Sequence, residues 1–286
     1  MKYSATTVFM PQLTLAEQAA LLSRLGFDGI ELRVRRVTDE VRAKAEPSNW
    51  GYHVNDLTPE NFAAKAPGIR TILADHGLSF GGIASNAPCT DLEQLKRLIE
   101  GAVACGGQPL LRVGATTGYK ADGSQNYWEI YGETVAGFAR VVELAKGTGI
   151  KLLIEMHGNT IHPSASLAYR LASNFSPNDV GVIYDPQNMV RDGYETIALA
   201  LQLLGPYLAH CHLGAHRPLL GTPNDKGTMQ WKWERCSLGD GLFDIPTMLA
   251  QFKKVGYQGF ISMEDFGNLP VEEKLTQALS YLKSVE

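Results

Sequence analysis

Four short apolar segments of the sequence each end in a residue type that binds metal ions. The segment KLLIE ends at Glu155, VGVIYD at Asp185, YLAHCH at His212 and GFISME at Glu264. Carboxylate oxygens and imidazole nitrogens are common ligands of Mn²⁺, Mg²⁺, Co²⁺ and Zn²⁺. A buried carboxylate is costly unless it is paired or bound to a cation. The pattern therefore predicts one divalent metal ion held by these four side chains.

The four residues meet only if the segments before them are strands of one sheet. Apolar runs alternate eight times with segments of helical periodicity, which is typical of parallel strands joined by helices. Closed barrels of this kind run to roughly 250 residues around one core. We therefore expect an α/β fold, a single (β/α)8 TIM-barrel domain over residues 1–286. The expected strands are residues 3–9, 28–34, 78–84, 109–113, 150–155, 180–185, 207–212 and 259–264.

Capping residues and apolar periodicity predict the helices between the strands. Thr14 with Glu17 and Thr90 with Glu93 have the spacing of a capping box, and Thr58 precedes a proline that suits the first helical position. One long helix has an expected apolar stripe of Tyr131, Val135, Phe138, Val142 and Ala145. Further helices are expected near 164–172, 195–204, 244–255 and 270–284.

Two connections are long, residues 35–57 and 213–243, and both follow the carboxyl ends of expected strands. Barrel enzymes place their chemistry at this end, and long ordered loops are usually functional. Both loops are rich in cationic and aromatic residues, which also suit a subunit contact or a cover over the barrel. The residues concerned are Arg35, Arg36, Trp50 and His53 in the first loop and Arg217, Trp231, Trp233 and Arg235 in the second.

The composition narrows the classes of partner. The net charge is -4 and no stripe of Lys and Arg is present, so we expect no nucleic-acid partner. No apolar run reaches the roughly 18 residues of a membrane span, and the first residues lack the pattern of a secretory signal. The four cysteines form no CxxC pair, which favours reduced thiols. We therefore expect a cytoplasmic protein without a membrane partner.

Two histidines compete for the single imidazole position. His210 and His212 share one face of their strand, because side chains alternate between the two faces. His212 ends the strand at the level of the three carboxylates, whereas His210 lies one layer deeper. We therefore expect His212 to be the ligand.

Five motifs, in order, resemble the xylose isomerase-like TIM-barrel superfamily of sugar isomerases and epimerases. They are FDGIELRV, LLIEMHGN, VIYDPQNM, LAHCHLGAH and LGDGLFDIPTMLAQFKKVGYQGFISMED. The ligand spacing and the H-L-G run look most like ketose 3-epimerases. The resemblance implies that Glu155, Asp185, His212 and Glu264 bind manganese, magnesium, cobalt or zinc. It also implies that Glu155 and Glu264 are catalytic, moving the proton α to a carbonyl through an enediolate.

The resemblance implies roles for five neighbouring residues. His157, Asn188 and Arg217 are expected to bind the hydroxyl groups of the substrate. Glu31 and His210 are expected to lie behind the ligands and to orient them by hydrogen bonds. Many epimerase relatives have histidine where this chain has Asn188, which leaves the substrate open.

Several functions share this barrel. An enolate formed by the same first step can expel a β-hydroxyl, so dehydration of an inosose-type keto-polyol is one alternative. A non-catalytic sugar-binding barrel is a second. Phosphodiester hydrolysis like that of endonuclease IV is a third, which requires more metal ligands. The expected partner is a small sugar or keto-polyol, and relatives of this kind often form homo-oligomers.

Overall fold

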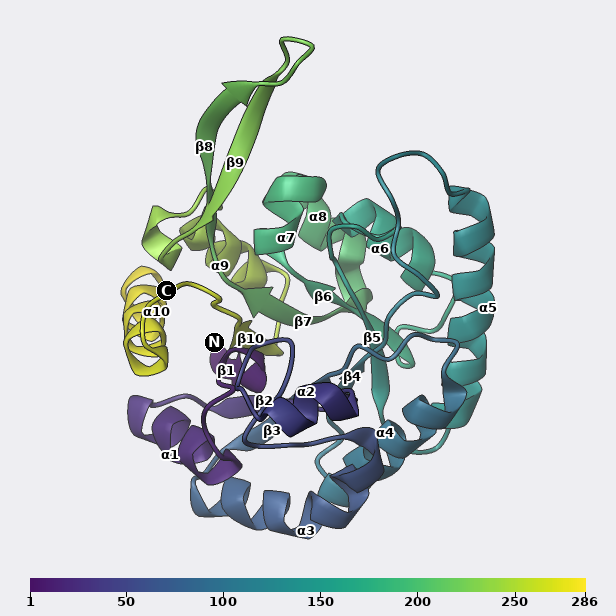
Figure 1. Cartoon of the computed structure of the whole chain (residues 1–286), viewed down its shortest axis with the longest axis vertical. Coiled ribbons are helices and arrows are strands. Elements are labelled where there is room, and N and C mark those ends of the chain that lie inside the picture. Colours follow the sequence, from purple (N-terminus) through teal and green to yellow (C-terminus); the bar gives the residue numbers. More distant parts are fainter.

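Eight parallel strands form a closed barrel in the computed structural model, which describes residues 1–286 (Figure 1). The strands are hydrogen-bonded in the order β1-β10-β7-β6-β5-β4-β3-β2, so the first and last strands close the ring. This architecture confirms the predicted (β/α)8 barrel. The barrel strands are β1 (Lys2–Thr6), β2 (Gly29–Arg33), β3 (Ser79–Ala84), β4 (Leu110–Arg112), β5 (Lys151–Glu155), β6 (Val180–Tyr184), β7 (Leu208–Leu213) and β10 (Phe260–Met263).

Helices surround the barrel on its outer side (Figure 1). None of them combines the length and apolar character needed to cross a membrane. The expected helix at 195–204 is preceded by a short helix, α7, that periodicity did not indicate. The helices are α1 (Leu15–Leu25), α2 (Asp39–Lys44), α3 (Pro59–Asp75), α4 (Leu92–Cys105), α5 (Tyr127–Ala145), α6 (Ala165–Ala172), α7 (Pro186–Asp192), α8 (Ile197–Leu204), α9 (Ile245–Lys254) and α10 (Val271–Val285).

The predicted helix starts are confirmed at two of three places. Thr14 and Glu17 form the capping box of α1, and Thr58 precedes α3 with proline at its first position. The box predicted from Thr90 and Glu93 is wrong. Asp91 is the N-cap of α4, and its carboxylate accepts a hydrogen bond from the backbone N–H of Gln94 at 3.0 Å. An aspartate one residue later reaches the third helical N–H, so it displaces the threonine.

Strand β1 is shorter than residues 3–9, because the chain turns into a 3-10 helix at Thr7–Phe9. The Thr6 side chain caps this turn by accepting from the N–H of Val8 at 3.4 Å. The Thr7 hydroxyl accepts from the N–H of Arg33 at 2.8 Å, which fixes the turn to β2.

The buried face of α5 lies beside the predicted stripe. Phe138 and Ala145 are buried as expected, but Tyr131, Val135 and Val142 are only half-buried. The predicted stripe is displaced by about one position around the helix from the buried face. Side chains three and four residues apart share one broad face, so periodicity does not fix its centre. The residues of α5 that are buried are Ile130, Thr134, Gly137, Phe138, Val141 and Ala145.

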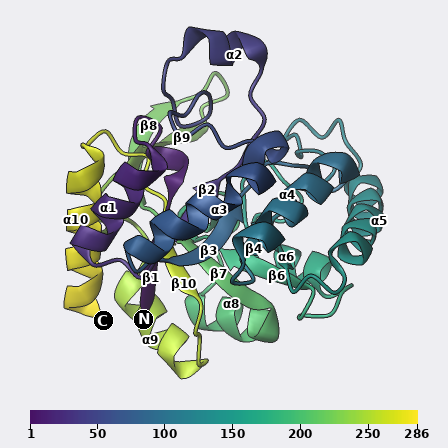
Figure 2. The same ribbon diagram turned by 90° about the horizontal axis from the view of Figure 1, so that it is seen from below.

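The two long connections contain secondary structure of their own. The first carries α2, and the second contains an antiparallel hairpin of β8 (His216–Pro223) and β9 (Met229–Arg235), where a loop was expected. The hairpin projects far beyond the barrel (Figure 1), and α2 stands away from the end where the N-terminus lies (Figure 2). Both connections follow strand carboxyl ends, where they flank the mouth of the barrel.

Apolar side chains pack outside the barrel strands, whereas buried polar side chains gather inside the barrel. Large apolar side chains fill the space between strands and helices, as where Tyr184 packs against Phe243 and Phe252. The buried polar residues Glu31 and His210 instead hydrogen-bond to one another across the barrel interior. Strand register shifts immediately beside both, between Ile30 and Glu31 against β3 and at Ile183 against His210. Such irregularities re-aim side chains near functional sites.

Candidate metal and active site

The structure brings together the four side chains that the sequence singled out. Glu155 ends β5, Asp185 follows β6, His212 lies in β7 and Glu264 follows β10. All four are buried, and one ligand atom of each lies within 4.8 Å of the others. His212 Nδ1 is 2.8 Å from Glu155 Oε1 and 3.5 Å from Glu264 Oε2. The parallel barrel thus focuses four strand ends on one point.

This group fits a divalent cation. A ligand atom lies about 2.0–2.6 Å from a bound ion, so two ligand atoms on opposite sides of the ion are separated by roughly 4–5 Å. Burial raises the pKa of Asp185 well above its usual value, and the Glu155 and Glu264 carboxylates raise it further. A divalent cation removes this repulsion by holding all three carboxylates ionised. The donor set and the charge of the group therefore suit a metal site.

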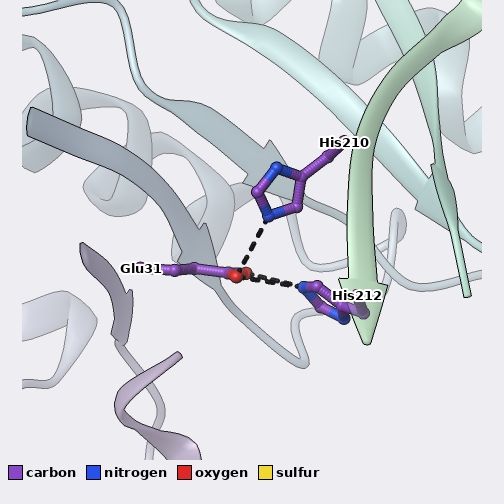
Figure 3. A group of neighbouring side chains, drawn as sticks. All are labelled: Glu31, His210 and His212. Atoms are coloured by element: carbon purple, nitrogen blue, oxygen red, sulfur yellow. Dashed lines mark hydrogen bonds and ion pairs between the residues drawn. The ribbon is translucent and has the colours of Figure 1, made fainter. Parts of the chain in front are cut away.

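A fourth carboxylate, that of Glu31, orients His212 from behind (Figure 3). His212 Nε2 lies 3.0 Å from both carboxylate oxygens of Glu31. Glu31 also accepts from Ser262 Oγ at 2.8 Å and lies 3.1 Å from His210 Nε2. His210 therefore faces Glu31, and only His212 joins the group of four. This arrangement leaves Nδ1 of His212 directed at the carboxylates, as metal-binding histidines held by a carboxylate are.

Glu31 and His212 stabilise each other's charged form. Burial opposes ionisation of Glu31, but His212 and then His210 lower its pKa well below the usual value. Burial likewise opposes protonation of His212, but Glu31 and Glu264 raise its pKa well above the usual value. A proton and a metal ion compete for the same lone pair on Nδ1.

Arg112, at the end of β4, was not singled out from the sequence. Its guanidinium forms an ion pair with Glu155 Oε2 and donates to the carbonyl oxygen of Ser85 at 2.6 Å. Burial would raise the pKa of Glu155, but Arg112, and then His212, lower it. Glu155 is therefore held ionised and in a fixed orientation. A charged residue closing the apolar run LLR was the available indication.

A cavity of about 210 Å³ opens onto the group of four. Glu155, His212 and Glu264 line it, while Asp185 lies behind them. Gln187 Nε2 donates to Glu264 Oε2 at 3.3 Å. The other lining residues are Arg35, Trp50, Ala84, Arg112, His157, Asn188, Arg191, His216, Arg235 and Phe266.

The residues expected to bind substrate are only partly brought to this cavity. His157 and Asn188 line it, and Asn188 Nδ2 also donates to Asp185 Oδ2 at 2.6 Å. Arg217 does not line it, because this side chain is exposed on β8 and pairs with Glu234 at 2.6 Å. Of the other loop residues named from the sequence, Arg35, Trp50 and Arg235 line the cavity, whereas Trp231 and Trp233 do not.

Trp50 and Phe266 form the aromatic wall of the cavity. Their ring centroids are 4.8 Å apart, and both residues line the cavity. Trp50 comes from the connection after β2 and Phe266 from the segment after β10, so the aromatic pair joins two parts of the chain far apart in sequence. An apolar wall of this kind suits one face of a sugar ring.

Comparisons with known proteins agree with this fold. A family model described as xylose isomerase-like TIM barrel matches residues 19–285. No curated protein matches the chain by sequence. Among solved structures, a D-psicose 3-epimerase determined in the presence of D-fructose aligns with a TM-score of 0.72 at 17% identity, covering 100% of this chain and 99% of that one.

Two further structures are similar over nearly their whole length. A probable 3-DHS dehydratase of petrobactin synthesis from Bacillus anthracis has a TM-score of 0.72 at 16% identity, covering 99% of each chain. A xylose isomerase-like TIM barrel protein from Mycobacterium smegmatis, in complex with magnesium, has a TM-score of 0.70 at 17% identity, covering 99% of this chain and 96% of that one. At such identities the likeness shows the fold, and the family match over residues 19–285 shows the lineage. The resemblance predicted from the motifs is thereby confirmed: the chain belongs to the xylose isomerase-like TIM-barrel family.

Proposed function

We propose that the protein is a divalent-metal-dependent isomerase or epimerase of a small carbohydrate. One observation carries the proposal: Glu155 and Glu264 belong to the buried group of four and also line the cavity. A carboxylate in this position can bind a metal through one oxygen and exchange a proton with a ligand through the other. When bound, the ion supplies a Lewis acid that polarises the substrate carbonyl.

The two glutamates differ in their surroundings, which suits two roles. Glu155 is ionised beside Arg112, so it is ready to accept a proton from the carbon next to the carbonyl. The electrons of the broken C–H bond then form the carbon–carbon double bond of an enediolate. Glu264, held by Gln187, takes up a proton from solvent and delivers it to the opposite face of the same carbon, which inverts it, while Glu155 releases its proton to solvent. Return to the neighbouring carbon gives isomerisation instead.

The remaining cavity residues position the substrate. His157 and Asn188 offer hydrogen bonds to hydroxyl groups, and the Trp50–Phe266 pair offers an apolar face. The epimerase and the magnesium complex among the similar structures support this choice of chemistry and cofactor. The similar dehydratase makes elimination the main alternative outcome of the same first step.

Solvent exchange tests the proposal. The protein with added Mn²⁺ is incubated with a panel of ketoses and inososes in deuterated buffer, and the products are followed by NMR. Deuterium at an inverted carbon is expected for epimerisation, deuterium at the adjacent carbon for isomerisation, and an enone for dehydration. Glu264→Gln should lower the rate of inversion by at least about 100-fold, while Glu133→Gln on the exposed face of α5 should not.

Two results would contradict the proposal. Inversion that persists in full after Glu264→Gln would remove the acid–base role of that residue. Exchange that is unchanged by chelation of the metal would remove the cation from the reaction.

A further inference from the structure

Three arginines line the cavity without a carboxylate partner. Arg112 is paired with Glu155, but Arg35, Arg191 and Arg235 form no ion pair. Elsewhere in the chain, five arginines pair with acidic side chains and four do not: Arg24, Arg36, Arg42, Arg97 and Arg217 are paired, and Arg33, Arg70, Arg140 and Arg170 are unpaired. We refer to Arg35, Arg191 and Arg235 as the arginine rim.

Arg35 is the most deeply placed member of the rim. Its side chain is buried at 9% exposure, and its only hydrogen bond is from Nε to the carbonyl oxygen of Ala84 at 3.3 Å. Burial, together with Arg112 and Arg33, lowers the pKa of Arg35 to about 9. A guanidinium has five N–H donors, and a buried donor without an acceptor is costly. A bound ligand that supplies acceptors would remove this cost.

Aromatic contacts connect Arg35 to Arg235. The Arg35 guanidinium lies 5.5 Å from the ring centre of Trp50, and that of Arg235 lies 5.2 Å from the ring centre of Phe266. Because Trp50 and Phe266 contact each other, the two arginines flank one aromatic pair. Stacking holds a guanidinium plane in place, and Arg235 Nη1 also donates to the Phe266 carbonyl oxygen at 3.2 Å. The remaining N–H groups are free to bind an anion.

His216 connects Arg235 to Arg191. Burial, followed by Arg191 and Arg235, lowers the pKa of His216 to about 4. His216 is 9% exposed, and its Nδ1 has no hydrogen-bond partner. The three residues line both the cavity and an adjoining outer hollow. A cationic rim thus runs from the interior beside Glu264 to the mouth.

We propose that the substrate carries an anionic group, a phosphate or a carboxylate, and that the arginine rim binds it. The proposal rests on the proposed function, because it assigns the substrate class of the same cavity. Guanidinium groups bind both anions through paired N–H donors. The lining holds four arginines but only two carboxylates, Glu155 and Glu264. An anionic ligand would balance the excess positive charge of the lining. A neutral sugar would leave buried Arg35 without an acceptor for its terminal N–H groups, whereas Arg191 and Arg235 are exposed at the mouth.

Anion binding tests the rim without turnover. Inorganic phosphate and D-gluconate are titrated calorimetrically into the Mg²⁺-loaded protein at constant ionic strength. We expect one of them to bind, and we expect Arg191→Gln and Arg235→Gln each to weaken binding by at least about tenfold. Arg140→Gln, an exposed arginine of α5 without an ion pair, is the matched control and should bind like the unchanged protein. An anion held by the metal alone would bind equally to all variants and would overturn the proposal, as would no binding.

A substrate comparison separates the two anions and the two proposals. In the deuterium-exchange assay, D-fructose is compared with D-fructose 6-phosphate and with 5-keto-D-gluconate. We expect a kcat/KM at least about tenfold higher for one of the anionic compounds, and this advantage should disappear in Arg235→Gln. Faster exchange of the neutral ketose, with no effect of Arg235→Gln, would refute the anionic substrate and leave the proposed function standing. Anion binding at the rim without exchange of any compound would refute the proposed function and leave the rim standing.

Discussion

Replacing Glu31 with glutamine removes the charge that orients His212 while keeping the shape of the side chain. Both carboxylate oxygens of Glu31 lie 3.0 Å from His212 Nε2, and Glu31 is only 2% exposed, so water has little access to replace them. Loss of such a partner behind a metal-binding histidine typically lowers metal affinity by about 10–100-fold. This factor corresponds to about 1.4–2.7 kcal/mol of binding free energy. Ser262→Ala should weaken binding less, because it removes one donor to Glu31 but leaves the charge.

The affinity is measured by titrating Mn²⁺ into the metal-free protein and recording free Mn²⁺ by electron paramagnetic resonance. Thermal unfolding without metal separates a loss of binding from a loss of structure. Glu133→Gln is the control, since this glutamate is exposed on α5. If Glu31→Gln stays folded and binds Mn²⁺ as tightly as the unchanged protein, Glu31 does not position His212.

Three further predictions concern packing and metal removal. Phe252→Ala, which empties a fully buried position against Tyr184, should lower the free energy of unfolding by about 3–5 kcal/mol, measured in guanidinium chloride, and a change below about 1 kcal/mol would contradict the packing. Gly101→Ala should destabilise the protein by about 1–3 kcal/mol, because the added methyl group would lie 2.2 Å from the Phe62 ring. Gly68→Ala is the matched control: its methyl group meets no atom within 4 Å, so it should stabilise the protein by about 0.4–1 kcal/mol. Chelation of divalent ions should lower Tm, and Mn²⁺ at about 100 times its Kd should restore about 2.7 kcal/mol; a Tm indifferent to both would argue against a metal bound to the folded state.

The group of four was predictable because it follows from two local rules. Side chains alternate along strands, and the carboxyl ends of parallel barrel strands meet at one mouth. Glu155 and His212 each lie at the end of a short apolar run, so their convergence needed only the correct fold. The choice of His212 over His210 followed from depth alone.

The contacts among the other cavity residues depend on packing that no local pattern reveals. Arg112 reaches Glu155 because β4 and β5 are paired, with Arg112 opposite Leu153, two residues before Glu155. Arg35 and Arg235 meet through two aromatic side chains from different connections. Arg217 was expected in the cavity because it closely follows His212, but the hairpin carries it outward.

The turn of the hairpin has a recognisable sequence pattern. Residues 224–227 form a turn in which the Gly227 N–H donates to the Asn224 carbonyl oxygen at 2.8 Å, with Gly227 at a φ of +78°. An asparagine followed by a glycine three residues later, between apolar and aromatic segments, is typical of a hairpin turn. The two prolines of β8 are tolerated because this two-stranded ribbon has a free edge.

Anomalous diffraction from crystals grown with Mn²⁺ tests the metal site most directly. We predict one strong anomalous peak per chain, about 2.0–2.4 Å from oxygens of Glu155, Asp185 and Glu264 and from Nδ1 of His212. The peak should vanish in Asp185→Asn crystals that retain the fold. A peak elsewhere, or none at this position at saturating Mn²⁺, would contradict the assignment.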